Sequence, residues 1–409
     1  MKSTLSVYLL LLILSAACST TKNAVHQNKV LLTQEIDSVY NRKLFNGFGV
    51  AIVDENHILY EQGFGVSNRI TGKKYGHNTL QNIASVSKTF VGIALLKAQE
   101  LGKLKLDDPI QLYLPFSIIN PHFPEAKITI RHLATHTSSI IDNAYYLSQN
   151  YYLKPGQDIQ GMQLVFDEEQ ILNPTDSIIP LSSFLENMLT EHGQWNQNSF
   201  SSYSPGTMYE YSNTGTTLAA FIIEQATGQS FREFTQKYIL DPLRMKDSGW
   251  GFSDIDFSCF STLYADPETV LPFYEMITYP DGGFITSVHD LSLYLSELIK
   301  GYNGTGTLLT KESYQEYFRP QLSAENFTER SENNPYNESY NTGIFIGFGY
   351  TGYIGHTGGD PGVLSMLFFD PRTKLGRIMI FNTSFSDQAG NNAFYDIWNI
   401  LEKYQEKIR

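Results

Sequence analysis

Apolar and polar residues alternate near both ends of the chain, which is the pattern of half-buried β-strands. Between Phe48 and Gly65 the alternation runs through Asp54-Glu55-Asn56, and this arrangement predicts a β-hairpin. Because strand signals are few between residues 103 and 280, we predict an antiparallel sheet with an inserted, mainly helical lobe, an α/β (α+β) fold. Three further strands, each closed by turn residues, are predicted at 345–355, 363–369 and 375–382.

Apolar residues at helical spacing predict several helices. From Ser85 to Gly102 the pattern is apolar over most of the circumference near its start, which indicates a buried helix. Ser287, with Asp290 three residues on, resembles a capping box that opens a helix reaching Lys300. Other helices are predicted around 30–39, 214–225 and 388–403. Two polar stretches rich in Asn, Gln, Ser and Tyr are predicted to be long surface loops, at 142–203 and 321–341.

The first residues resemble a secretory signal. Met1-Lys2 precedes an apolar run that is shorter than the roughly 20 residues of a membrane span, so residues 1–17 are predicted to be a signal peptide. Cys18 follows directly and is predicted to carry a lipid, with residues 18–28 as a tether and 29–409 as the folded domain. Ser15 stands where a lipidation motif usually has an aliphatic residue, so an ordinary cleavage after Ala17 is the alternative. The predicted location is the periplasm, at a bacterial membrane.

The composition limits the partners of the chain. Its 409 residues are 42% hydrophobic and 17% charged, with 29 basic against 42 acidic residues and a net charge of −13. An acidic protein gains nothing from contacts with phosphates, so nucleic acid is not expected as a partner. Contact with a membrane is expected only through the lipid anchor.

Ser85-Val86-Ser87-Lys88 is a candidate catalytic motif. At the start of a buried helix, Ser85 and Lys88 would lie one turn apart on the same face. Apolar surroundings lower the pKa of a lysine, which then can accept the proton of a serine nucleophile. The alternative is a helix-capping serine followed by a surface lysine. The same spacing at Ser19 and Lys22, in the predicted tether, shows that the motif alone is not specific.

Tyr211-Ser212-Asn213 precedes a predicted helix. If this segment is extended, both outer side chains point the same way. The tyrosine can then exchange a proton with a leaving group, and the asparagine can bind a substrate amide. The alternative is a tyrosine followed by an asparagine that caps the helix.

His356-Thr357-Gly358-Gly359 follows a predicted strand. Without side chains at Gly358 and Gly359, a substrate backbone can lie against the strand edge. The backbone N–H groups of Ser85 and Gly359 are candidate donors of an oxyanion hole. The alternative is a glycine turn with a histidine beside it.

A metal site is not predicted, and neither is a cofactor. His132 and His136 are four residues apart, as zinc ligands on a helix are. No third ligand lies near them in the sequence.

The three motifs, in this order, resemble those of the serine β-lactamase and penicillin-binding family, in its branch of class C β-lactamases, DD-peptidases and related esterases. The likeness extends over about residues 45–403. Four more segments carry it: 128–138 (ITIRHLATHTS), 204–216 (SPGTMYEYSNTGT), 242–250 (PLRMKDSGW) and 280–287 (PDGGFITS).

The resemblance implies a role for each motif. Ser85 would be the acylated nucleophile, and Lys88 and Tyr211 the proton-transfer pair. Asn213 would contact the substrate amide. The strand of His356, Thr357 and Gly358 would line the site, and Gly359 would be the second oxyanion donor.

Two positions depart from the family pattern. Class C β-lactamases carry lysine where this chain has His356, whereas some DD-peptidases and D-aminopeptidases carry histidine. A histidine is mostly neutral near pH 7, so we favour a peptidase or esterase over a β-lactamase. If the substrate has a carboxylate, His356 is expected to bind it best as an imidazolium, with affinity that weakens as pH rises. Ser139 stands where the family usually has glycine, and a local adjustment of the turn is expected.

The predicted function is that of an exported serine hydrolase that acts through an acyl-enzyme on Ser85. Its expected substrate is a D-amino-acid peptide or amide, including peptidoglycan-derived peptides. The alternatives are a small ester or a β-lactam. An alternative of another class is a catalytically silent module that binds muropeptides or β-lactams; the presence of Ser85, Lys88 and Tyr211 together argues against it.

Overall fold

The computed structural model describes residues 23–166, 170–328, 343–348, 352–385 and 387–409. The chain divides into two compact units, Met1–Leu44 with Phe385–Arg409, and Phe45–Ser384. The domain predicted for 29–409 is therefore divided between them, and each unit is described by itself. The predicted signal peptide and Cys18 lie outside the described residues.

The smaller unit consists of two helices, residues 23–40 and α12 (Gln388–Gln405). Residues 23–28, predicted as part of the tether, form the start of the first helix. Their polar side chains find partners near the C-terminus: Asn28 Nδ2 donates to the Lys407 carbonyl oxygen at 3.0 Å. Further along the helix, Glu35 accepts from Lys403 and from the Tyr404 hydroxyl, each at 2.7 Å. In the part of the chain that is described, no helix has both the length and the hydropathy to cross a bilayer.

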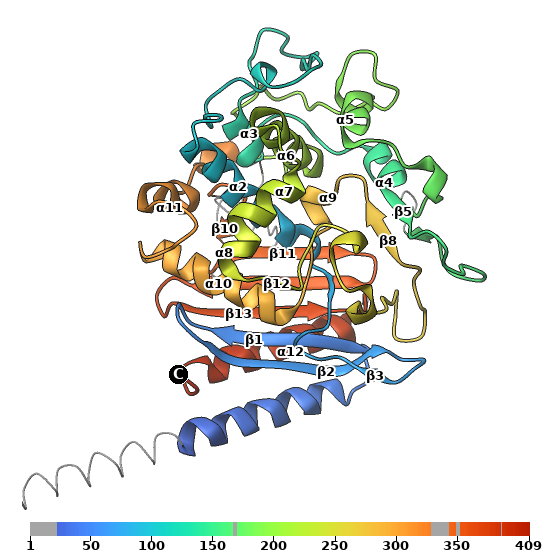
Figure 1. The fold of residues 1–409 in the computed structure, drawn as a ribbon, viewed down its shortest axis with the longest axis vertical. Helices are drawn as coiled ribbons and strands as arrows, with labels where there is room; N and C mark the ends of the chain where they lie inside the picture. The colour runs from blue at the N-terminus through green and yellow to red at the C-terminus, as the bar shows by residue number, and fades with distance from the viewer. Residues whose placement is uncertain (1–22, 167–169, 329–342, 349–351, 386) are drawn as a thin grey trace, which may run out of the picture. The chain divides into compact units, whose positions relative to one another are not determined.

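The larger unit contains a seven-stranded sheet in the order β10-β11-β12-β13-β1-β2-β3 (Figure 1). All of its neighbouring strands are antiparallel, so the predicted sheet shared by the two ends of this unit is confirmed. Phe48 shows how they meet, since its ring stacks on Phe64 and Phe381 of the two adjacent strands. The strands are β1 (Gly47–Val53), β2 (Ile58–Asn68), β3 (Lys73–Lys74), β10 (Gly347–Phe348), β11 (Ile354–Asp360), β12 (Val363–Asp370) and β13 (Leu375–Phe381).

The prediction of one continuous strand over residues 345–355 is wrong. Phe345 has a left-handed backbone with φ 53°, and its N–H donates to the Ala134 carbonyl oxygen, outside the sheet. Gly352 also has positive φ, at 82°. The two breaks leave a two-residue β10 and shift the start of β11 to Ile354.

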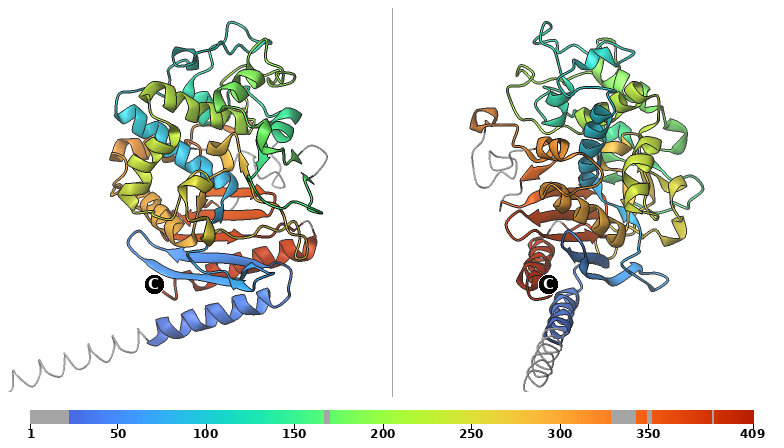
Figure 2. Two further views of the ribbon diagram at one scale, coloured as in Figure 1. Left: turned by 45° about the vertical axis from the view of Figure 1, so that its right-hand side comes forward. Right: turned by 60° about the vertical axis from the view of Figure 1, so that its left-hand side comes forward.

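Helices cover the sheet and form the inserted lobe (Figures 1 and 2). Helix α10 lies against β1 and β13, and its N-cap Ser287 accepts from the Asp290 N–H at 3.1 Å, as predicted. The buried α2 packs on α6. The α-helices of this unit are α2 (Lys88–Glu100), α3 (Ile130–Ala134), α4 (Ala144–Asn150), α5 (Leu181–Leu189), α6 (Asn213–Thr227), α7 (Phe231–Thr235), α8 (Asp241–Leu243), α9 (Tyr279–Gly282), α10 (Val288–Tyr302) and α11 (Lys311–Phe318).

The polar stretch 142–203 was wrongly predicted as a long loop. It holds α4, α5 and short strands, because its polar side chains complete backbone hydrogen bonds. Asn143 caps α4 by accepting from Tyr145 N–H at 2.9 Å, and its amide donates to the Trp195 and Gln197 carbonyl oxygens. In the second polar stretch, residues 329–341 lie outside the described part. The short strands of the lobe are β5 (Tyr151–Leu153), β6 (Val165–Phe166), β7 (Gln170–Ile171) and β8 (Tyr274–Met276), and β4 (Gln81–Asn82) pairs with β9 (Ile285–Thr286).

Candidate active site

Ser85 and Lys88 meet at the start of α2. Ser85 lies in the 3₁₀ turn η1 (Ala84–Ser87), and Lys88 is the first residue of α2. Lys88 Nζ donates to Ser85 Oγ at 2.9 Å and to the Asp281 carbonyl oxygen at 2.7 Å. The lysine is fully buried, whereas the serine is partly exposed. The alternative of a capping serine with a surface lysine is therefore wrong.

Burial also shifts the pKa of Lys88. Removing an ammonium group from water disfavours its charged form and lowers the pKa of Lys88, although Asp281, Asp142 and Asp360 partly oppose this shift. The neutral amine can accept a proton from Ser85 Oγ, which is the requirement of a general base.

The turn that carries Ser85 is held close to the sheet. Ala84 adopts φ 47°, a left-handed conformation that costs an alanine about 1 kcal/mol. A Cβ on Gly358 of β11 would overlap the Ile83 carbonyl oxygen and lie 3.0 Å from the Ser85 nitrogen. The hydroxyl of Ser365 donates to the same Ile83 oxygen at 2.7 Å. Glycine at 358 is thus what lets β11 approach the backbone of the nucleophile.

Tyr211 lies beside Lys88. The Lys88 ammonium nitrogen is 5.1 Å from the centre of the Tyr211 ring. The Tyr211 ring stacks on the His136 ring at a centroid distance of 4.6 Å. The centroid of the His356 ring lies 6.2 Å from that of Tyr211. The structure therefore brings Ser85, Lys88 and Tyr211 together, as the motifs predicted.

His136 was considered from the sequence only as a zinc ligand. It is buried with φ 55°, and its Nδ1 accepts the Ser212 N–H at 3.1 Å. Burial, with Lys88 and His356 nearby, holds the pKa of His136 well below its usual value, so the ring is neutral. His132 Nδ1 accepts a different N–H, that of Thr129. Among the described residues no three His, Cys, Asp or Glu side chains group as metal ligands would.

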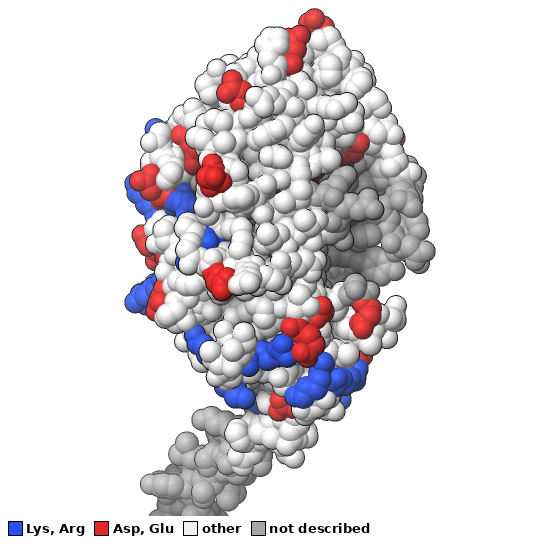
Figure 3. Space-filling model, turned by 90° about the vertical axis from the view of Figure 1, so that its right-hand side faces the viewer, with Lys and Arg blue, Asp and Glu red and all other residues white. Residues whose placement is uncertain are grey.

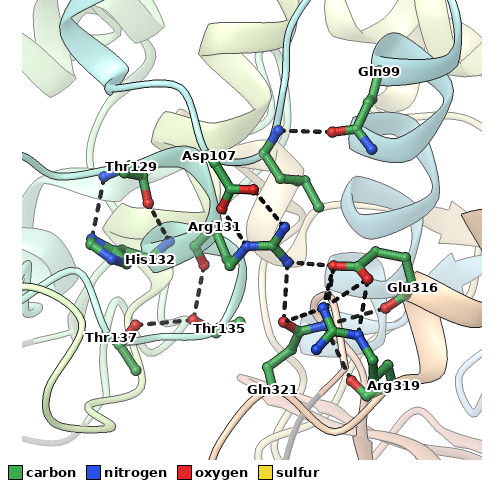
Figure 4. A network of polar contacts seen from close by, with 11 residues as sticks. Gln99, Asp107, Thr129, Arg131, His132, Thr135, Thr137, Glu316, Arg319 and Gln321 are labelled. Carbon is green, nitrogen blue, oxygen red and sulfur yellow. Dashed lines mark hydrogen bonds and ion pairs between the residues drawn. The ribbon is translucent and has the colours of Figure 1, made fainter.

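A polar network fixes the helix that presents His136 (Figure 4). In α3, Arg131 donates to both oxygens of Asp107, at 2.6 and 3.0 Å, and also pairs with Glu316. The Thr135 hydroxyl donates to the Arg131 carbonyl oxygen at 2.8 Å and contacts the Thr137 hydroxyl at 3.0 Å. These contacts stabilise the left-handed turn on either side of His136.

The same turn explains the serine that replaces glycine in the family pattern. Ser139 keeps a left-handed backbone, with φ 64°. Its hydroxyl accepts from Asn120 Nδ2 at 2.8 Å, which partly offsets the strain. The backbone of the turn therefore keeps the left-handed conformation that suits glycine. The expected local adjustment is the added hydrogen bond between the Ser139 hydroxyl and Asn120.

Asn213 is oriented by Asp142, a residue that sequence reasoning missed. One oxygen of Asp142 accepts from the Asn213 N–H and Nδ2, each at 2.9 Å, and the other accepts from the Thr214 N–H and hydroxyl. Because a carboxylate only accepts, the amide nitrogen of Asn213 must face Asp142, and its oxygen remains for another donor. The cap of α6 is Ser212, which accepts from Gly215 N–H, so the alternative of a capping Asn213 is wrong.

The His356 motif lies within β11, paired with β12, and not after a strand. The His356 side chain is buried, and its Nδ1 lies 2.5 Å from the Thr357 carbonyl oxygen. Burial and the neighbouring Lys88 lower the pKa of His356 to about 3. His356 therefore has no positive charge near pH 7 with which to bind a carboxylate. Thr357 and Gly359 are exposed, and Gly358 is buried against the turn of Ser85.

A pocket of about 170 Å³ opens beside the nucleophile. Burial raises the pKa of Asp281 to about 6 and that of Asp360 to about 7, with Lys88 opposing both shifts. In the described part of the chain, no Lys or Arg side chain lines this pocket. Its walls include Ser85, Asn213, Gly359, Tyr146, Asp281 and Asp360. Tyr146 and Asp360 were not predicted as site residues, and Asp281 was noted only within the 280–287 segment.

The chain matches the model of the family described as Beta-lactamase over residues 33–402. It belongs to the Beta-lactamase family. This confirms the predicted family, a family of serine hydrolases, and with it the predicted fold class.

Proteins with different names resemble the chain. It is 29% identical over 261 residues to esterase EstB of Burkholderia gladioli, covering 62% of this chain and 60% of the esterase. The octameric penicillin-binding protein homologue from Pyrococcus abyssi has a TM-score of 0.68 at 23% identity, with 93% of this chain and 77% of that chain covered. The D-amino acid amidase from Ochrobactrum anthropi SV3 has a TM-score of 0.63 at 18% identity, with 91% and 98% covered. At these identities the two structures show the fold alone.

Proposed function

We propose that the protein hydrolyses amides of D-amino acids through an acyl-enzyme on Ser85. The observation that carries this proposal is the 2.9 Å hydrogen bond between Lys88 Nζ and Ser85 Oγ at a fully buried lysine. Neutral Lys88 takes the hydroxyl proton while Ser85 Oγ forms a bond to the substrate carbonyl carbon. The backbone N–H groups of Ser85 and Gly359 stabilise the oxygen that becomes negative.

The second half of the reaction needs a proton at the leaving nitrogen. Tyr211, beside Lys88, donates this proton as the carbon–nitrogen bond breaks and regains one from the lysine. Water then attacks the ester carbon of acylated Ser85, and the proton lost by water returns to Ser85 Oγ. Neutral His136 supports the ring of Tyr211 by stacking.

The pocket supports an amide substrate over a carboxylate-bearing one. The oxygen of Asn213, left free by Asp142, can accept the N–H of a substrate amide. A β-lactam or a peptide C-terminus would bring a carboxylate next to Asp281 and Asp360, where like charges repel. His356, being neutral, offers no compensating charge. The D-amino acid amidase with a similar fold is in line with this choice.

A fluorophosphonate probe tests the nucleophile. The probe is expected to add its mass to a peptide that contains Ser85, and Ser85→Ala is expected to lose turnover by about 10⁶-fold. Ser87→Ala is the matched control, because its hydroxyl bonds the Ala84 carbonyl oxygen in the same turn and does not line the pocket. Undiminished labelling of Ser85→Ala would refute the mechanism.

An esterase is the second candidate, because the chain is 29% identical to esterase EstB over 261 residues. A panel of D-amino-acid anilides and short-chain p-nitrophenyl esters separates the two functions through kcat/KM. Turnover of the esters with no measurable hydrolysis of any anilide would favour the esterase.

Export and anchoring are proposed on the sequence of residues 1–18. Cys18→Ala is expected to move the protein from the detergent fraction to the soluble fraction of cells, and Ser19→Ala serves as the control. Wild-type protein in the soluble fraction that begins with an unmodified Cys18 would contradict lipidation.

The Lys and Arg side chains visible in Figure 3 gather along one margin and the lower end, mixed with acidic ones, which is in line with a small substrate and not nucleic acid.

A further inference from the structure

The two carboxylates of the pocket differ in their hydrogen bonds. Asp281 uses both oxygens, accepting from the Tyr146 hydroxyl at 3.0 Å and from the Thr217 hydroxyl at 2.8 Å. Asp360 uses only Oδ1, which accepts from the Tyr151 hydroxyl at 2.7 Å. Among the described residues, its Oδ2 has no hydrogen-bond partner.

The unused oxygen of Asp360 is directed at the wall of the pocket. A Cβ on Gly282, which lines the pocket, would lie 3.2 Å from Asp360 Oδ2. Asp360 follows Gly359, the proposed oxyanion donor, directly in β11, and both residues line the pocket. The α-substituent of a substrate, two bonds from its carbonyl carbon, would fall in the same region.

The charges around the nucleophile leave a place for a cation. The negative charges of Asp142, Asp281 and Asp360 all favour the protonated form of Lys88 and oppose the lowering of its pKa by burial. When Lys88 is neutral, as a base must be, the carboxylates of the pocket have no positive neighbour among the described side chains that line it. Asp281 and Asp360 also repel each other, and this repulsion adds to the burial that raises the pKa of Asp360. A bound cation would relieve the repulsion.

We propose that Asp360 Oδ2 binds the free α-ammonium group of the substrate, so that the enzyme acts on amides of unblocked amino acids. The inference rests on the proposed function, since it assigns the substrate of the same Ser85 site. Tyr151 is a positioning residue, because it holds Oδ1 and turns Oδ2 towards the pocket. The pocket volume of about 170 Å³ corresponds to about six water molecules, which suits a small side chain near Leu147 and Met276.

The test compares two substrates that differ only at the amine: D-alanine p-nitroanilide and its N-acetyl derivative. The measured quantity is the ratio of their kcat/KM values, which does not depend on the fraction of enzyme that is folded. The wild-type ratio is expected to favour the free amine by about 10- to 100-fold, the range of a hydrogen bond to a charged group. Asp360→Asn, which can still accept from Tyr151, is expected to bring the ratio close to one.

Asp158→Asn is the matched control. It changes the net charge equally but lies on the surface, outside the pocket, and its ratio should equal that of the wild type. A wild-type ratio near one, or an unchanged ratio in Asp360→Asn, overturns the role of Asp360 while the serine mechanism stands. If neither substrate turns over and fluorophosphonate does not label Ser85, the proposed function itself fails, and the inference fails with it.

Discussion

Lys88 has two chemically opposite neighbourhoods. On one side lie His136, His356 and Tyr211, the imidazole side; on the other lie Asp281 and Asp360, the carboxylate side. Burial acts on both by disfavouring charge, but the results differ. The imidazole pKa values fall far below neutrality, whereas those of the two carboxyl groups rise only to about 6 and 7. Charge near the nucleophile is therefore negative and confined to one side, which favours a cationic or neutral substrate.

Removing Lys88 should have the largest effect on this arrangement. Lys88→Met deletes the base, and kcat is expected to fall by about 10²- to 10⁴-fold. Lys97→Met, in the same helix but paired with Glu100, is the control and should keep kcat within about twofold of the wild type. Steady-state kinetics on a D-amino-acid anilide measure both. Retention of most of the activity in Lys88→Met would mean that another group accepts the proton.

The pH dependence distinguishes the two sides. A carboxyl with a pKa of about 7 is about 1% ionised at pH 5. For a free-amine substrate we therefore expect kcat/KM to rise several tens-fold from pH 5 to pH 7 as Asp360 ionises. Asp360→Asn should lose most of this rise, and His356→Gln should keep it, because His356 stays neutral throughout.

Asp281 and Lys88 titrate as well, so only the difference between the two variants is diagnostic. A profile that flattens in His356→Gln and not in Asp360→Asn would show that the imidazole side carries the relevant charge.

The strand that joins the two sides offers a third test, since β11 contains both His356 and Asp360. Gly358→Ala places a methyl group against the backbone of Ile83 and Ser85, and we expect about 1–3 kcal/mol of destabilisation with loss of activity. Gly359→Ala is the matched control for stability, because its Cβ would meet only Leu364, at 3.8 Å. Urea unfolding measures both variants. Equal stabilities would show that β11 does not need its close approach to the nucleophile.

The smallest effect is expected in the turn that supports the imidazole side. Ser139→Gly relieves left-handed strain of about 1 kcal/mol but loses the hydrogen bond from Asn120, which is worth about as much. The two changes should nearly cancel in the free energy of unfolding. In an Asn120→Ala background that bond is already absent, so Ser139→Gly should then stabilise by about 1 kcal/mol. If Ser139→Gly destabilises the protein in both backgrounds, glycine relieves no strain at this position.

Local patterns in the sequence were sufficient for the elements that depend on neighbouring residues. The alternation around Asp54 identified the hairpin, and Ser287 with Asp290 marked the start of α10, because turns and caps are made within a few residues. Ser85 and Lys88 were recognisable for the same reason, since one helical turn joins them.

Elements that depend on distant partners were not recognised. Residues 23–28 and 142–203 look polar enough for flexible segments, but their side chains bond to parts of the chain far away in sequence. Tyr151 and Asp360 carried no motif, because they meet only where β5 and β11 come together at the pocket. Asp142 carried none either, because its partners Asn213 and Thr214 lie about 70 residues away in the sequence.

The sequence by itself was sufficient to recognise the pairing of Ser85 with Lys88, the sheet and the family. Only the tertiary structure decided the charge of the site. The pKa of a buried group depends on desolvation and on charges that approach through space, and neither is visible in the spacing of residues. His356 looked like a titratable reader of carboxylates until its burial beside Lys88 was known. Asp360 was not singled out from the sequence, and only the fold places it in the same pocket as Ser85.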